Sequence, residues 1–294
     1  MRNSLMVRSL LTLAVFLVAC RTSGQCVSDY RNDRWLDICR NYRSGREDPG
    51  HACALRVVPV RLLGHAIEVD ARENGSILVL GSDDHSVRVT ARLQAYARDD
   101  AAARDLLRDL KFATDGGRVS LDGPISFWRE NGSVTYVILV PRSFDLQLDA
   151  SNGSLGVTGV NGKLDLRTVN GSVNLAGVGG DVRVQTQNGS INLRLSGSKW
   201  RGAGLNAETL NGSVRLGIPE SYAAQVDIAT ETGRVTADFP LTAQSAIGQH
   251  LTLPLNGGGT TLKVTTTNGS VRLLREADSP ANQLGGFGKL GCGR

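Results

Sequence analysis

The chain contains few residues of the types that carry catalytic chemistry. Its histidines are far apart in the sequence and form no HExxH zinc-protease motif: His51, His65, His85 and His250. A G-x-S-x-G nucleophile elbow and a phosphate-binding P-loop are also absent from the sequence. The polar run at residues 83–85 is typical of a solvated turn. We therefore expect no catalytic residue, no metal site and no cofactor.

Thiol chemistry in the chain rests on five cysteines: Cys20, Cys26, Cys39, Cys53 and Cys292. Lipidation of Cys20 would leave an even number, which suits disulfides in an oxidising compartment. A disulfide over 26–39 or 39–53 leaves one cysteine to pair with Cys292, and the sequence does not choose among the pairings. A zinc site that includes His51 is the alternative, but separations of 13 and 14 residues are not typical of metal ligands.

Acidic side chains in repeated turns can bind calcium, as the aspartates of calcium-binding toxin repeats do. The equivalent turn positions in this chain are Ser154, Lys163, Ser172, Asp181 and Ser190, which do not form a calcium ladder. A glycosidase on a β-helix would instead need two carboxylates at a suitable separation. The outward-facing aspartates show no aligned pair on neighbouring coils: Asp145, Asp149, Asp165 and Asp181.

The elements that must position these side chains come from a repeat between Phe144 and Arg194. Two aliphatic columns recur in it with a period of nine residues. The first column contains Leu146, Leu155, Leu164, Val173, Val182 and Ile191. The second contains Leu148, Val157, Leu166, Leu175, Val184 and Leu193. Alternation with polar neighbours predicts short strands with one buried face, so the fold class is all-β.

Asparagine and glycine between the strands predict tight turns, because both residues tolerate positive φ. The predicted turn residues are Asn152, Gly153, Asn161, Gly162, Asn170, Gly171, Asn188, Gly189, Asn211, Gly212, Asn268 and Gly269. The strongest signal, Asn-Gly-Ser, recurs at 152, 170 and 188, which is a period of 18 residues. This alternation favours a β-solenoid with two units per coil. An antiparallel meander, in which Leu166 faces Leu175 across a hairpin, is the alternative.

Strand patterns flank the repeat and define one large domain over residues 57–275. A helix is expected over Asp99–Phe112, where alanine and leucine form an apolar stripe. Residues 21–56 are expected to form a cysteine-containing linker, and residues 276–294 a flexible, glycine-rich tail.

The first twenty residues have the features of a signal peptide. Arg2 and Arg8 supply the positively charged region that precedes the apolar run Leu10–Ala19, and this run is too short to span a bilayer. The sequence Leu-Val-Ala-Cys ending at Cys20 resembles a bacterial lipobox, whose cysteine is diacylated. The mature protein would then be a membrane-anchored lipoprotein of the periplasm or outer membrane. Ordinary secretion with a slightly later cleavage is the alternative.

The order of the elements resembles the bacterial putative-adhesin domain family of unknown function. An Ala/Arg/Leu helix at Ala101–Leu110 precedes a strand, Tyr136–Arg142, that ends in Val-Pro-Arg, and NG-x-V-x-L repeats follow. The resemblance covers roughly residues 57–275 and implies an exported, non-enzymatic, right-handed β-solenoid. It implies no site residues, because the family has no established ones.

Charge and composition narrow the expected partners. The net charge is +5, but the basic residues are scattered among acidic ones and only 5% of residues are aromatic. Such a chain lacks both a basic patch and a base-stacking platform, so nucleic acid is not an expected partner.

The sequence predicts an exported, adhesin-like structural or binding module of the cell envelope. Its expected partners are the envelope surface, a polysaccharide or a protein, with contact to the membrane through the lipid anchor. An envelope-sensing or signalling scaffold that binds a membrane protein is the first alternative. A polysaccharide-active enzyme on a β-helix is the second.

Overall fold

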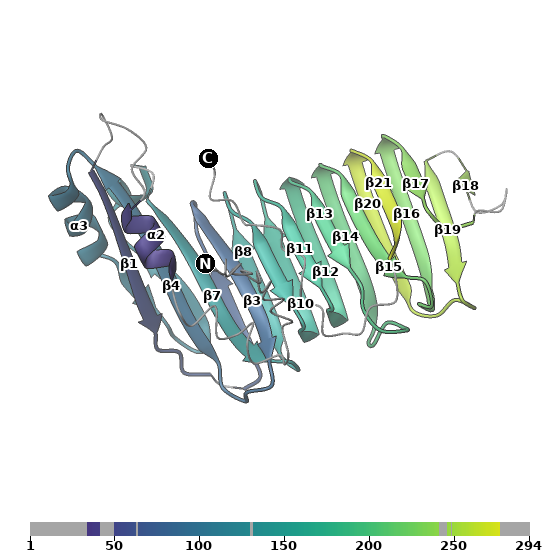
Figure 1. Ribbon diagram of the computed structural model, residues 1–294, viewed down its shortest axis with the longest axis horizontal. Helices are drawn as coiled ribbons and strands as arrows, with labels where there is room; N and C mark the ends of the chain where they lie inside the picture. Colours follow the sequence, from purple (N-terminus) through teal and green to yellow (C-terminus); the bar gives the residue numbers. More distant parts are fainter. Residues whose placement is uncertain are drawn as a thin grey trace, which may run out of the picture. The chain divides into compact units, whose positions relative to one another are not determined.

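The computed structural model describes residues 34–41, 50–62, 64–129, 132–240, 246–247 and 249–276 (Figure 1). All of them belong to the second of two units into which the chain divides, Arg34–Arg294. The predicted signal peptide and the glycine-rich tail lie outside the described residues. The same is true of the proposed lipidation site Cys20, the linker residue Cys26 and the tail residue Cys292. Within the described part, no helix is long and apolar enough to cross a membrane.

Two sheets account for the strands of the described residues, and we name them sheet A and sheet B. Sheet A contains, in spatial order, β1 (Gly50–Val58), β4 (Arg88–Ala97), β7 (Ser133–Pro141), β3 (Gly75–Ser82), β9 (Leu155–Thr158), β11 (Val173–Ala176), β13 (Ile191–Arg194), β15 (Val214–Pro219), β21 (Val271–Glu276) and β17 (Val235–Ala237).

Sheet B contains, in spatial order, β18 (Ala246–Ile247), β19 (His250–Leu255), β16 (Ala224–Thr232), β20 (Thr261–Asn268), β14 (Gly204–Asn211), β12 (Gly179–Asn188), β10 (Asn161–Thr168), β8 (Asp145–Ala150), β2 (Ala66–Asp70), β6 (Arg118–Asp122) and β5 (Lys111–Ala113).

The strands of the repeat pair in parallel and alternate between the two sheets. In sheet B, Leu164 of β10 pairs with Leu146 on one side and with Val182 on the other. In sheet A, Val173 of β11 pairs with Leu155 and Ile191 in the same way. The aliphatic columns face inward and form the core between the sheets. The meander alternative is wrong for this segment, because β10 and β11 follow one another in sequence but lie in different sheets.

Stacking order departs from sequence order near both ends of the array (Figure 1). Strands β20 and β21 lie between β14/β15 and β16/β17, although they come last in the chain. At the other end, β2 and β3 lie between β6/β7 and β8/β9. Each inserted pair is therefore hydrogen-bonded on both sides.

Antiparallel strands cover the ends of the parallel array. Strands β4 and β1 continue sheet A beyond β7, and β5 continues sheet B beyond β6. At the far end β19 pairs antiparallel with β16. Covering a strand edge in this way protects unpaired backbone groups from other chains. Strand β1 begins at Gly50, so the linker expected over 21–56 is too long, because β1 pairs with β4 along its whole length.

The described residues contain three helices: α2 (Arg34–Asn41), α3 (Asp100–Arg108) and α4 (Ile125–Arg129). In α3 the side chain of Asp99 caps the first turn by accepting from the backbone N–H of Ala102 at 2.8 Å. The predicted extension to Phe112 is wrong, because residues 111–113 form the edge strand β5. Helices α2 and α4 were not expected from the sequence.

Candidate functional site

The asparagines of one solenoid corner form a hydrogen-bonded ladder. The amide of Asn170 donates to Asn152 and that of Asn188 donates to Asn170, both at 2.8 Å. Asn211 and Asn268 extend the ladder at 2.9 and 2.8 Å. Asn161, by contrast, begins strand β10 at another corner. Most of the predicted turn asparagines therefore stabilise one another across coils.

The glycines beside this ladder allow coils to approach closely. None of Gly153, Gly171, Gly189, Gly212 and Gly269 has a φ in the left-handed region, so the expected reason for glycine is wrong. A Cβ on Gly189 would lie 1.9 Å from the carbonyl oxygen of Gly171. Buried threonines donate to the same row of carbonyl oxygens, Thr168 to Gly153 at 2.9 Å and Thr186 to Gly171 at 3.0 Å. The backbones of successive coils are tightly packed at this corner.

A shallow groove of about 880 Å³ crosses the outer surface of sheet B beside this corner. We call it the sheet B groove. Its floor is a row of side chains on successive strands: Asp70, Asp149, Arg167, Gln185, Glu208, Thr265 and Ala229. Register places these residues side by side, one from each strand. Because neighbouring strands are about 4.8 Å apart, the groove presents a regular polar row.

Hydrogen bonds fix the polar side chains in the middle of the groove. Glu208 accepts from the amide of Asn206 at 2.8 Å and from that of Gln185 at 3.2 Å. These two bonds hold the pKa of Glu208 below its usual value, so the carboxylate is charged at neutral pH. Arg167 pairs with Asp165 at 2.7 Å. The groove thus offers a fixed carboxylate beside a guanidinium and an amide.

Two carboxylates are neighbours at the N-terminal end of the sheet B groove. Asp70 of β2 is in register with Asp149 of β8, and both line the groove. The prediction that Asp145, Asp149, Asp165 and Asp181 form no aligned pair among themselves is confirmed by the registers, but Asp70 supplies a partner for Asp149 that the prediction did not include. It considered only the repeat, whereas β2 comes much earlier in the sequence. Burial raises the pKa of Asp149, and the negative charges of Asp70 and Asp165 act in the same direction.

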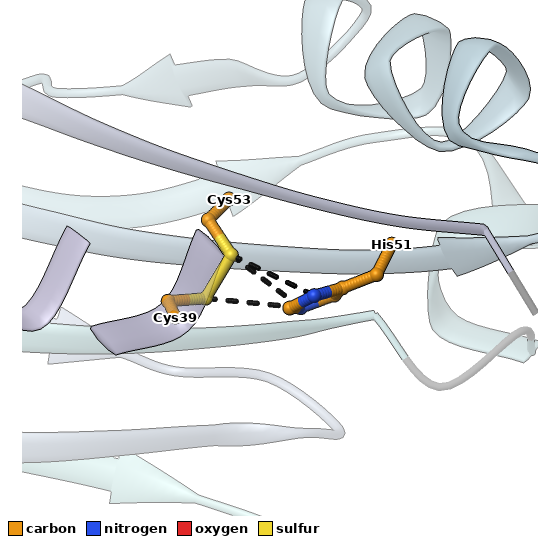
Figure 2. A group of neighbouring side chains, drawn as sticks. All are labelled: Cys39, His51 and Cys53. Carbon is orange, nitrogen blue, oxygen red and sulfur yellow. Dashed lines mark hydrogen bonds between the residues drawn. A yellow bond between two sulfur atoms is a disulfide. The ribbon is translucent and has the colours of Figure 1, made fainter. Parts of the chain in front are cut away.

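A second cluster forms where α2 packs against β1. Cys39 and Cys53 form a disulfide with their Cα atoms 6.3 Å apart. Figure 2 shows the imidazole of His51 against this disulfide, with Nε2 3.4 Å from Sγ of Cys53 and 3.7 Å from Sγ of Cys39. The His51 ring also stacks on Tyr96, with 4.6 Å between centroids. Burial lowers the pKa of His51, and Asp100 opposes this shift. The sequence separations of 13 and 14 residues between successive cysteines gave no reason to expect Cys39, His51 and Cys53 together; packing of α2 on β1 brings them to one place.

The other chemistry-bearing residues are exposed or paired. Asp83 pairs with Arg142 at 2.6 Å and Asp84 pairs with Arg88 at 2.7 Å, so the polar run at 83–85 forms surface ion pairs. His250 contacts the carboxylate of Asp227 at 2.5 Å on an exposed surface. His65 is exposed and lies outside both clusters.

Solved structures with a similar arrangement have very different sequences. A putative cell adhesion protein from Clostridium sporogenes is 12% identical, with a TM-score of 0.40 over 77% of this chain and 100% of that one. A putative adhesin from Bacteroides fragilis is 13% identical, with a TM-score of 0.38 over 77% and 99%. A putative lipid binding protein from Parabacteroides distasonis is 10% identical, with a TM-score of 0.32 over 75% and 96%.

Comparison of the sequence with models of protein families assigns most of the described chain to one family. No curated protein matches the sequence at a significant level. The model of the Toastrack DUF4097 family matches residues 81–274, which include the repeat, strand β20, most of β21 and the whole of helix α3. This chain belongs to the Toastrack DUF4097 family.

Proposed function

We propose that this protein is an exported, non-enzymatic, adhesin-like module that binds a polysaccharide of the cell envelope along the sheet B groove. The observation that carries the proposal is the row of polar side chains that crosses successive strands of sheet B. A linear polymer that lies across the strands would meet a new donor or acceptor about every 4.8 Å. Membership of a family that resembles adhesins agrees with this role.

The chemistry of the groove suits a hydroxyl-rich ligand. Gln185 and Thr265 offer neutral donors and acceptors, and Glu208 offers a carboxylate that hydrogen bonds already hold in place. Val169 and Leu210, with 37% and 46% of their surfaces exposed, line the same groove and offer apolar contact to the C–H faces of a sugar. Few side chains need to be ordered on binding, so the entropic cost is small.

Binding assays with matched variants test this proposal. Purified protein would be incubated with a panel of envelope polysaccharides at low and high salt. We expect saturable binding that survives high salt and weakens at least tenfold in Arg167→Ala and Glu208→Gln. Arg215→Ala, which removes an exposed arginine from sheet A, is the matched control and should bind normally. Binding that high salt abolishes in every variant would reflect only net charge and would refute the groove.

Hydrolysis of a polysaccharide is the second candidate, and the Asp70–Asp149 pair favours it. The two aspartates are opposite one another on neighbouring strands, which lie about 4.8 Å apart, and retaining glycosidases use two carboxyl groups about 5–5.5 Å apart. The raised pKa of Asp149 suits a general acid. We prefer binding because Asp70 accepts from the backbone N–H of Arg72 at 2.8 Å and lies between arginines. New reducing ends that disappear in Asp149→Asn would establish hydrolysis and refute the non-enzymatic role.

The export route belongs to the same proposal. Acylation at Cys20 would anchor the protein to a membrane, in the periplasm or at the outer membrane. Expression in a bacterium, followed by membrane fractionation and mass spectrometry of the N-terminal peptide, measures the modification. We expect a diacylated Cys20 in the membrane fraction and a soluble product in Cys20→Ser. An unmodified N-terminus at a residue after Cys20 would contradict lipid anchoring and support ordinary secretion.

A further inference from the structure

The cluster at Cys39, His51 and Cys53 has the composition of a soft-metal site. His51 and Cys53 are two residues apart on β1, so their side chains lie on the same face of the strand. Helix α2 packs on β1 and brings the buried Cys39 to that face. One nitrogen and two sulfur atoms, all within 4.8 Å of one another, therefore meet at one place (Figure 2).

The two nitrogen–sulfur distances in the cluster are close to those of a zinc centre. Zinc binds sulfur at about 2.3 Å and imidazole nitrogen at about 2.0–2.1 Å, so tetrahedral geometry separates the two ligand atoms by about 3.6 Å. The observed distances from Nε2 of His51 to the two sulfurs are 3.4 and 3.7 Å. Two thiolates on the same ion would lie about 3.8 Å apart. The ligand geometry therefore needs cleavage of the disulfide and a movement of the two sulfurs away from each other.

Neighbouring residues already orient the imidazole. The His51 ring stacks on Tyr96 with an interplanar angle of 15°. The backbone N–H of His51 donates to Asp100 at 3.0 Å, which ties this part of β1 to the first turn of α3. A ring that its neighbours already hold in place loses little further freedom when a metal binds.

We propose that the reduced form of this cluster binds a zinc ion through the thiolates of Cys39 and Cys53 and through Nε2 of His51. An exogenous dithiol cleaves the disulfide: it gives two electrons and two protons to the two sulfurs and becomes a disulfide itself. The metal then displaces one proton from each thiol. The fourth zinc position is open to water or an external ligand. The disulfide and the metal exclude one another, so the site reports the redox state of its surroundings.

Either state holds helix α2 against the sheet. The disulfide joins α2 to β1 covalently, and a shared zinc ion would join the same two elements by coordination. Reduction without metal would remove both links. The reduced protein should therefore be most stable with zinc present, because an ion that binds only the folded state stabilises that state.

Zinc titration of the full chain tests the proposal. Cys20, Cys26 and Cys292 are replaced by serine, so that Cys39 and Cys53 supply the only thiols. A phosphine reductant is used, because dithiols bind zinc themselves. We expect one zinc ion per reduced chain by calorimetry, a rise in melting temperature, and protection of both thiols from alkylation. The unreduced protein should bind no zinc at this site.

His51→Ala separates coordination by three ligands from simple capture by two thiols. We expect at least a tenfold weaker affinity in reduced His51→Ala, and unchanged affinity in His65→Ala, the matched control at an exposed histidine. Equal affinity of the reduced and unreduced proteins would overturn the proposal. So would equal affinity of His51→Ala and its parent. If reduction alone unfolds the chain, the reduced protein is refolded in the presence of zinc and the titration is repeated. Failure of zinc to restore folding would then refute the site.

Discussion

The hydroxyl of Thr186 donates a 3.0 Å hydrogen bond to the backbone carbonyl oxygen of Gly171 on the preceding coil. The same carbonyl oxygen lies where a Cβ on Gly189 would have to be. The carbonyl oxygen of Gly171 therefore explains two features of the following coil: position 189 must be glycine, and position 186 must carry a hydroxyl. This relationship recurs along the array and keeps the sheet B groove beside a rigid corner.

Replacing Gly189 with alanine should destabilise the fold. The new Cβ would meet Gly171 oxygen at 1.9 Å and Thr186 Oγ1 at 3.0 Å, and backbone must move to relieve the first clash. We expect a loss of about 1–3 kcal/mol in the free energy of unfolding, measured by urea denaturation. Gln187→Ala, at an exposed position in the same corner, is the control and should change little. An unchanged midpoint for Gly189→Ala would contradict the close-approach explanation.

Replacing Thr186 with valine should also destabilise the fold, through the lost hydrogen bond. Valine keeps the volume and branching of threonine, but it leaves the carbonyl oxygen of Gly171 without this donor. The expected cost is about 1–3 kcal/mol in the same denaturation assay. Thr186→Ser keeps the hydroxyl and should lose clearly less. If serine and valine cost the same, shape rather than hydrogen bonding holds the corner.

Two groove carboxylates should have opposite effects on the pH dependence of stability. The raised pKa of Asp149 means that the folded state binds a proton more tightly than the unfolded state. The charged group therefore destabilises the fold at neutral pH, and this penalty disappears as the pH falls through the folded and then the unfolded pKa. Asp149→Asn should raise the denaturation midpoint at pH 7 and have no effect in strong acid.

Glu208 provides the matched case. Its pKa is lowered by hydrogen bonds from Asn206 and Gln185, so its charge stabilises the fold above the unfolded pKa. That stability is lost as the pH falls through the lowered folded pKa. Glu208→Gln should therefore lower the midpoint at pH 7 and converge with the parent in acid. Shifts of the same sign in both variants would contradict the assigned environments.

Removing the disulfide should loosen helix α2. Cys39 and Cys53 close a loop with a sequence separation of 14 residues. A loop of this length corresponds to about 3 kcal/mol in the unfolded-chain entropy model. The double variant Cys39→Ala with Cys53→Ala should lose about that amount in metal-free buffer, compared with unreduced parent. Urea denaturation followed by circular dichroism measures the loss, and an unchanged midpoint would mean that α2 is held by packing alone.

Deleting residues 50–140 should expose the array to aggregation. The deletion removes β1 to β7, so β8 and β9 each lose the partner strand on one side, β2 and β3 respectively. Unpaired parallel edges then recruit other chains. We expect aggregates in size-exclusion chromatography, whereas the full chain elutes as a defined species. A soluble monomer of this deletion variant would show that the strands before β8 are dispensable for solubility.

Much of the central fold could be predicted from local spacing. The columns that contain Leu146 and Leu155 recur at a fixed period, and alternation alone decides which side chains are buried. The Asn-Gly-Ser period also predicted the coil, although positive φ was the wrong reason for its glycines. Close approach between coils is invisible in the sequence, because it depends on where the next carbonyl oxygen lies.

The candidate sites depend on contacts that are distant in sequence. In the stacking order of the sheets, β20 lies beside β14 and β2 lies beside β8, although these strands are far apart in the sequence. That order brings Asp70 to Asp149 and creates one end of the sheet B groove. Packing of helix α2 on β1 brings Cys39 to the strand that carries His51 and Cys53. Sequence by itself determined the repeating strands and their buried columns, because these follow from neighbours along the chain. Only the tertiary structure decided the stacking order and the two polar clusters, because these follow from pairing between distant segments.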